Sequence, residues 1–147
     1  MKKTITVKKA YEVYALLRKA SFGNMSNADK FAVLAFTKVF RGIAEDFQRT
    51  LDDVEKDERL KPEGYAEAVE IINAVKRGEV KTQNEIYLAQ EVVGNYRKAV
   101  NDYLTQEGKA ERAFDYTPLR TDVFDVLVSA NAEWKVEHLI LLDEINN

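Results

Sequence analysis

The chain has 147 residues, with 22 Lys and Arg against 25 Asp and Glu for a formal net charge of −3, one His and no Cys. This length fits one domain, and a 46% share of hydrophobic residues is enough for a packed core, which argues against a disordered chain. The absence of Cys excludes disulfides, thiol nucleophiles and thiolate zinc sites, and no apolar stretch approaches the roughly 18 residues that a membrane span needs.

The N-terminal segment predicts a short strand followed by a helix. Residues 4–7 alternate polar and apolar side chains, which is typical of a strand. Thr6 then caps a helix that continues to about Ser21, because apolar residues recur at helical spacing over this stretch.

A much longer helix is predicted over residues 27–58. Ser26 precedes it and Asp29 follows three residues later, as in a capping box. Gly42 lies in the middle of this helix, so either another helix crosses closely at that point or the helix bends, and we favour the close crossing. The apolar stripe, spaced by three and four residues, consists of Phe36, Phe40, Ile43, Phe47, Leu51 and Val54, and is widened at its start by Phe31 and Leu34.

The middle of the chain predicts two further helices. Pro62 ends the long helix and begins the next one, which stops at Arg77 or one residue earlier. Thr82 or Asn84 then caps a fourth helix over residues 83–106, whose apolar residues keep a spacing close to a heptad.

The last third of the chain predicts an extended segment and two more helices. Residues 114–119 alternate apolar with polar side chains and contain a proline, so they are the best candidate to pair with residues 4–7. Thr121 caps a short helix that Asn131 ends, and residues 134–145 form the last helix.

These elements predict a single mainly α domain over residues 1–147. We expect a bundle of five or six helices in which the long helix packs against the helix at 83–106, with a short two-strand pairing near the termini. Residues 139–142 are apolar on nearly every side, so they need cover from the bundle or from a second subunit.

The charges are distributed unevenly along the chain. Residues 1–41 hold nine basic and two acidic side chains, or +7, and residues 42–147 hold thirteen and twenty-three, or −10. Opposite fields steer association, so this asymmetry favours protein partners or a homo-oligomer, whereas the alternative is a solvated surface. The predicted interface residues are the basic Lys2, Lys3, Lys8, Lys9, Arg18 and Lys19 together with the apolar Trp134, Leu139 and Leu142.

No pattern in the sequence indicates catalytic or metal chemistry. His138 is the only histidine, without a second His or a Glu three residues before it, and a place at a packing boundary explains it. Asp46, Asp53 and Asp57 share a helix face that a divalent cation would bind weakly, although an acidic solvated face explains them equally. Because no glycine-rich phosphate loop or Ser–His–acid pattern appears, we expect no enzyme activity, no cofactor and no metal.

Several segments resemble one group of proteins. They read ITVKKAYEVYAL at residues 5–16, MSNADKF at 25–31, IAEDF at 43–47 and FDVLVSAN at 124–131. In these segments the chain is similar to small uncharacterised helical proteins encoded by tailed phages and prophages. The resemblance implies a phage context and a role in virion structure or assembly, and it assigns no functional residue.

The sequence therefore predicts a non-catalytic structural or assembly protein of a phage-type particle that acts through protein–protein interaction. We expect it in the cytoplasm of the host cell or incorporated in a virion. The alternative is a small phage or prophage regulator that binds a host protein or nucleic acid through its N-terminal lysines. A nucleic-acid partner is less favoured, because the pI of about 5.3 is acidic.

Overall fold

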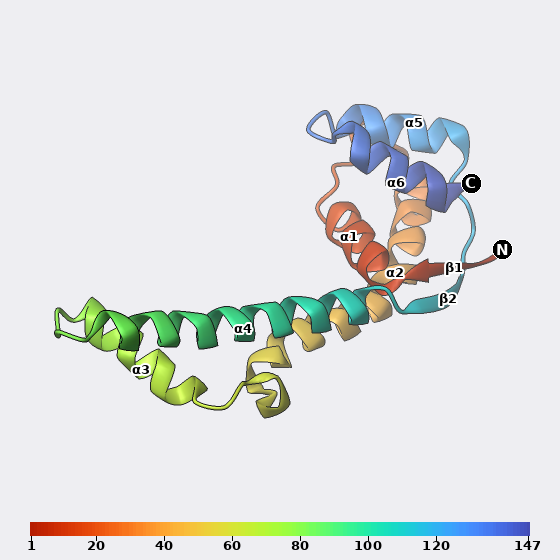
Figure 1. The fold of residues 1–147 in the computed structure, drawn as a ribbon. Coiled ribbons are helices and arrows are strands. Elements are labelled where there is room, and N and C mark those ends of the chain that lie inside the picture. Colours follow the sequence, from red (N-terminus) through yellow and green to blue (C-terminus); the bar gives the residue numbers. More distant parts are fainter. The chain divides into compact units, whose positions relative to one another are not determined.

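Six α-helices, two 3-10 turns and one two-stranded sheet make up the chain in the computed structural model, which describes residues 1–147 (Figure 1). The mainly α class, the long helix and the strand pairing are thus confirmed. The chain folds into two compact units. Unit 1 consists of Met1–Arg49 and Glu107–Asn147, and unit 2 consists of Thr50–Gln106. None of the helices is long and apolar enough to cross a membrane.

The sheet in unit 1 joins the N-terminus to the second half of the chain. Strand β1 (Lys2–Thr6) pairs antiparallel with β2 (Glu111–Asp115), and Lys3 lies opposite Phe114. The two-strand pairing near the termini is therefore confirmed, but the predicted partners are wrong: Thr4, Ile5 and Thr6 pair with Ala113, Arg112 and Glu111, and not with residues 114–119. Pro118 lies beyond the strand, as expected for a residue that cannot donate a backbone hydrogen bond.

Helix α1 (Val7–Leu17) follows the first strand directly. The hydroxyl of Thr6 accepts a hydrogen bond from the backbone N–H of Lys9 at 3.2 Å, which confirms the predicted cap. The helix ends four residues before Ser21, because both backbone groups of Ser21 are hydrogen-bonded to the side chain of Asn131 instead.

Helix α2 (Asn27–Asp53) is the longest helix, and 3-10 turns at Val54–Lys56 and Glu58–Leu60 follow it. Ser26 caps its start by accepting from the N–H of Asp29. The prediction that the helix continues to residue 58 is wrong, because Asp57 has an extended backbone and caps the second 3-10 turn. Of the predicted stripe, Phe36, Phe40, Ile43, Phe47 and Val54 are buried and Leu51 is half-buried.

Two expectations for α2 are corrected. Phe31 is 68% exposed and Leu34 is also exposed, so they do not widen the buried stripe. No atom lies within 4 Å of the position that a Cβ on Gly42 would take, so no other helix crosses closely there.

The core of unit 1 is built around α2. Its ring cluster joins Phe36 to Phe40, Phe40 to Phe114 and Phe114 to Tyr116, with centroids 5.2–5.5 Å apart. Helices α5 (Thr121–Ala130) and α6 (Val136–Asn146) complete the core with Leu127, Leu142 and Ile145.

Both C-terminal helices begin slightly differently from the prediction. Thr121 is the first residue of α5 and not its cap, since Arg120 holds the capping position without a side-chain hydrogen bond. Helix α6 begins two residues after Trp134, and the N–H of Lys135 donates to Nδ1 of His138 at 3.0 Å.

Two buried asparagines hold loop segments against these helices. Asn131 ends α5, as predicted, and its amide also bonds the N–H and C=O of Ser21. In the same way, Asn146 accepts from the N–H of Leu119 at 2.7 Å and donates to its carbonyl oxygen at 3.1 Å. The two side chains therefore satisfy buried backbone groups that have no partner in regular secondary structure.

Unit 2 contains the helical pair α3 (Tyr65–Lys76) and α4 (Gln83–Gly108), of which the last two residues of α4 belong to unit 1. The hydroxyl of Thr82 accepts from the N–H of Glu85, so Thr82 caps α4. The rings of Tyr65 and Tyr96 join the two helices at 4.5 Å. The long helix and the helix at 83–106, which the sequence placed at the centre of one bundle, belong largely to different units.

Candidate functional site

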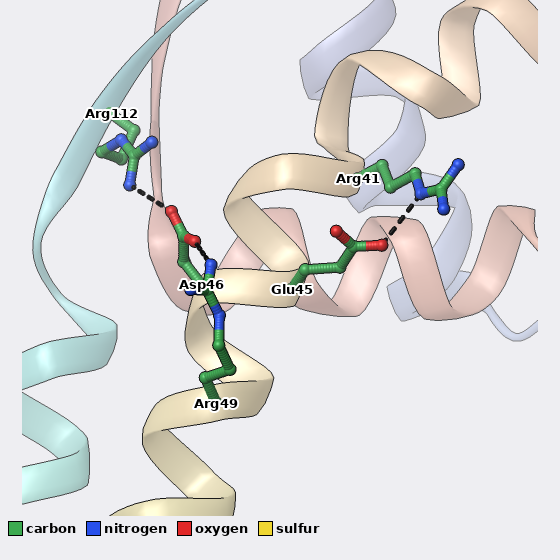
Figure 2. Close-up of polar contacts among 5 residues, drawn as sticks. All are labelled: Arg41, Glu45, Asp46, Arg49 and Arg112. Atoms are coloured by element: carbon green, nitrogen blue, oxygen red, sulfur yellow. Dashed lines mark hydrogen bonds and ion pairs between the residues drawn. The ribbon is translucent and has the colours of Figure 1, made fainter.

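A chain of ion pairs connects α2 with β2 on the surface of unit 1 (Figure 2). Arg41 donates to Glu45 at 2.9 Å, while Asp46 pairs with both Arg49 and, at 3.2 Å, Arg112. The hydrogen bond to Glu45 raises the pKa of the Arg41 guanidinium, which therefore stays charged. Two of these pairs lie within α2, and only the pair of Asp46 with Arg112 joins the helix to the strand. All five side chains are solvated, so each pair contributes little to stability.

The three aspartates that the sequence grouped as a weak cation site are engaged separately. Besides the contacts of Asp46, Asp53 pairs with Lys56 at 3.5 Å and Asp57 with Arg59 at 2.8 Å. No group of three or more His, Asp or Glu side chains lies close enough together to hold a metal ion. These carboxylates are therefore explained by their basic neighbours.

A groove of about 750 Å³ lies between α2 and the segment that follows β2. Its floor includes Phe36, and its charged groups are paired within the chain. Arg120 bonds Asp29 at 3.2 Å and Asp122 at 3.0 Å, and Asp115 bonds the terminal amine of Met1 at 3.1 Å. A charged ligand would have to displace these pairs.

A second groove, of about 670 Å³, lies between α1 and α6. It combines an apolar floor with charged edges, which is the usual make-up of a protein-binding surface. Helix α1 contributes Lys9, Tyr11, Glu12, Ala15 and Leu16, and α6 contributes Glu137, His138, Ile140, Leu141 and Glu144.

The two helices that form this groove are antiparallel. Lys9, at the start of α1, lies 3.6 Å from Glu144 near the end of α6. Lys3 donates to the carbonyl oxygens of Glu144 and Ile145 at 3.1 and 3.2 Å, and so satisfies acceptors in the last turn of α6. At the other end, Ser21 after α1 is bonded to Asn131 before α6. Polar contacts therefore join the two sides of the groove at both of its ends.

The outer face of α6 is exposed and mixes aliphatic with acidic residues. Val136 is 72% exposed and Ile140 is 54% exposed, and they lie one helical turn apart. Glu137, Asp143 and Glu144 surround them, and α6 contains no Lys or Arg. The opposite side of the helix packs into the core.

Helix α1 presents the other side of the groove. Lys9, Glu12, Leu16 and then Lys19, just beyond the helix, follow one another at spacings of three, four and three residues. The first three therefore line one face of the helix, and Lys19 follows in the exposed turn after it. We use the term α1–α6 face for Lys9, Glu12, Leu16 and Lys19 together with Val136, Glu137, Ile140, Asp143 and Glu144.

Contacts with α2 hold α1 in place beneath this face. The hydroxyl of Tyr11 donates to Gln48 at 2.8 Å, and its ring packs edge-on against Phe47 at 5.3 Å. On another side, a Cβ on Gly108 would lie only 3.2 Å from the Cβ of Lys8, so α1 and the end of α4 are closely packed there. The groove is therefore formed by rigid elements.

His138 has a structural task at the edge of the groove. Its Nδ1 accepts the N–H of Lys135 and so caps the first turn of α6, while Nε2 lies 3.8 Å from the carboxylate of Glu137. The sequence predicted a histidine at a packing boundary, and its half-buried ring lies between core and solvent.

The structure brings only part of the predicted interface together. Lys9 lines the groove and Leu139 is half-buried in α6. Lys3 is turned toward the end of α6 and the ring of Tyr116. Leu142 is 1% exposed, so the prediction of a surface anchor there is wrong: this side of α6 faces the core. Lys19 is exposed just beyond the end of α1, beside the groove. Lys2, Lys8 and Arg18 are exposed but do not line the groove, and Trp134 is half-buried.

Sequence reasoning missed Val136 and Ile140 as exposed residues and Leu16 as a half-buried residue of the groove. The run at 139–142 is apolar at four successive positions, which point in four directions around a helix. Periodicity therefore could not select the exposed side. The acidic residues Glu137, Asp143 and Glu144 could have identified the exposed side, because they lie three or four positions from Ile140 and therefore on the same side of the helix.

Comparison with known proteins adds no family to these observations. No protein-family model, no curated protein and no solved structure matches the chain. The interpretation of the α1–α6 face therefore depends on its own residues.

Proposed function

We propose that this chain is a non-catalytic structural or assembly protein that contacts other proteins through the α1–α6 face. The observation that carries the proposal is the pair Val136 and Ile140, exposed beside an apolar groove and surrounded by charged side chains. Burying one such aliphatic side chain contributes about 1.5–3 kcal/mol. An apolar centre with a charged rim is the arrangement that protein interfaces use.

The state of the titratable groups supports a non-catalytic role. The pKa values of Asp57, Asp115 and Asp122 are lowered, chiefly by hydrogen bonds from Arg59, the terminal amine and Arg120. Carboxylates with lowered pKa values are ionised at neutral pH, as ordinary carboxylates are, whereas a carboxyl that acts as a general acid or base there usually has a raised pKa. The single histidine caps a helix.

A place in a phage-type particle is supported by the sequence resemblance. The alternative, a regulator that binds nucleic acid or a host protein through the N-terminal lysines, has less support because Lys3 donates to two carbonyl oxygens in the last turn of α6. Assembly through the α1–α6 face is therefore the function that we favour.

Site-specific photo-crosslinking in cells that make the protein tests this function. The photoreactive residue p-benzoylphenylalanine replaces Val136, and Ile140→Asp is added in a second version. A matched control carries the same probe at Phe31, which is exposed to a similar extent on α2. Circular dichroism verifies that each variant is folded.

We expect discrete protein adducts from position 136 that disappear with Ile140→Asp and are absent with the probe at position 31. Adducts that are equal at both positions, or that survive Ile140→Asp, would contradict the proposed function.

A further inference from the structure

We propose that the α1–α6 face binds the same face of a second copy of this chain, so that the protein forms a twofold symmetric dimer. This inference rests on the proposed function and specifies the partner.

The two segments that carry the face have opposite net charges of equal size. Residues 7–19, which contain α1, hold four basic side chains and one acidic, or +3. Residues 133–147, which contain α6, hold four acidic side chains and one basic, or −3. On the face itself, Lys9, Glu12 and Lys19 give +1 on the α1 side, and Glu137, Asp143 and Glu144 give −3 on the α6 side, so the two sides are opposite in sign.

Such a face matches a copy of itself. A partner with only basic residues would be repelled by Lys9 and Lys19, and a partner with only acidic residues would be repelled by the carboxylates of α6. In a twofold dimer every contact occurs twice, with the two partners exchanged. A rotation about an axis along the groove therefore places α1 of each copy on α6 of the other.

The antiparallel direction of the helices sets the register of this contact. Because Lys9 lies beside Glu144 and both helices rise equally per residue, Leu16 is level with the first turn of α6. In the dimer, Lys9 of one copy then faces Glu144 of the other, so that the charges alternate around the axis. In the same dimer, Lys19 of one copy lies toward Glu133 of the other, and Leu16 of one copy covers the exposed Val136 of the other.

The test is a set of paired charge reversals measured by light scattering over a concentration series. One variant reverses the α1 side with Lys9→Glu and Lys19→Glu, and the other reverses the α6 side with Glu133→Lys and Glu144→Lys. A control, Lys38→Glu with Lys98→Glu, makes the same change in net charge as the α1 reversal at exposed positions outside the face.

The wild type is expected to approach twice its mass of 16.8 kDa at low salt. Each reversal should weaken the dimer about tenfold or more, since like charges then face one another, while the control leaves it unchanged. An equimolar mixture of the two reversed variants should restore the dimer, because each positive face then meets a negative one. Restoration also shows that both variants fold.

A wild type that remains at 16.8 kDa at every concentration would overturn this inference. A dimer that ignores the reversals, or a mixture that stays monomeric when both variants are folded, would overturn it as well. The crosslinking at position 136 separates this failure from failure of the proposed function, because adducts to a different protein that depend on Ile140 would uphold the function and exclude the second copy as its partner.

Discussion

Replacing Asn131 by alanine is expected to destabilise unit 1 by about 2–3 kcal/mol. The side chain is 1% exposed and makes three hydrogen bonds: it accepts from the N–H of Ser21 at 2.8 Å, and donates to the carbonyl oxygens of Ser21 at 2.9 Å and Leu127 at 2.7 Å. Each such bond contributes about 1 kcal/mol net, and the substitution removes the buried bond to the carbonyl oxygen of Leu127 together with the two part-buried bonds to Ser21. The loss should therefore be large for a single substitution.

Urea denaturation followed by circular dichroism measures this effect. Asn24→Ala, at an exposed position in the neighbouring loop, is the matched control and should change the free energy of unfolding by less than about 0.5 kcal/mol. Asn131→Asp retains the acceptor for Ser21 but places a carboxylate against two carbonyl oxygens, so it should also destabilise unit 1. If Asn131→Ala matched the control, the reasoning that this side chain secures the loop to α5 would be refuted.

Three further predictions concern stability and titration. Gly42→Ala should raise the free energy of unfolding by about 0.5–1 kcal/mol, because the site is helical and open; a loss in urea denaturation would contradict this. Tyr116→Phe should cause no loss in the same assay, since the buried hydroxyl has no partner, and a loss above about 1 kcal/mol would reveal one. Asp122 should titrate by carbon-detected NMR below its ordinary pKa, chiefly because Arg120 donates to it, so its stabilisation is present at neutral pH and lost as the pH falls through that lowered pKa. The midpoint should rise in Arg120→Ala, and an unchanged midpoint would be evidence against the pair.

Local signals in the sequence predicted most of the secondary structure. The caps at Thr6, Ser26 and Thr82 each have a hydroxyl that accepts from the N–H three residues later, so short-range chemistry located these helix starts. The buried stripe from Phe36 to Phe47 follows from helical spacing alone.

Features that depend on distant parts of the chain were not predicted. Phe31 lies two residues before the buried Val33 and five before the buried Phe36, so it is off the spacing of the stripe, and its side of α2 is exposed. Asn131 was identified as a helix end, but its bonds to Ser21 join positions 110 residues apart. The exposed side of α6 was hidden because residues 139–142 are apolar on every side.

Light scattering tests most directly whether the α1–α6 face joins two copies of the chain. The molar masses of the wild type, Ile140→Asp and Phe31→Asp are measured over the same concentrations at low and high salt. We expect the molar masses of the wild type and Phe31→Asp to approach twice 16.8 kDa at low salt and to fall at high salt as the dimer dissociates, while the molar mass of Ile140→Asp remains at 16.8 kDa. Masses that do not distinguish Ile140→Asp from Phe31→Asp would contradict it.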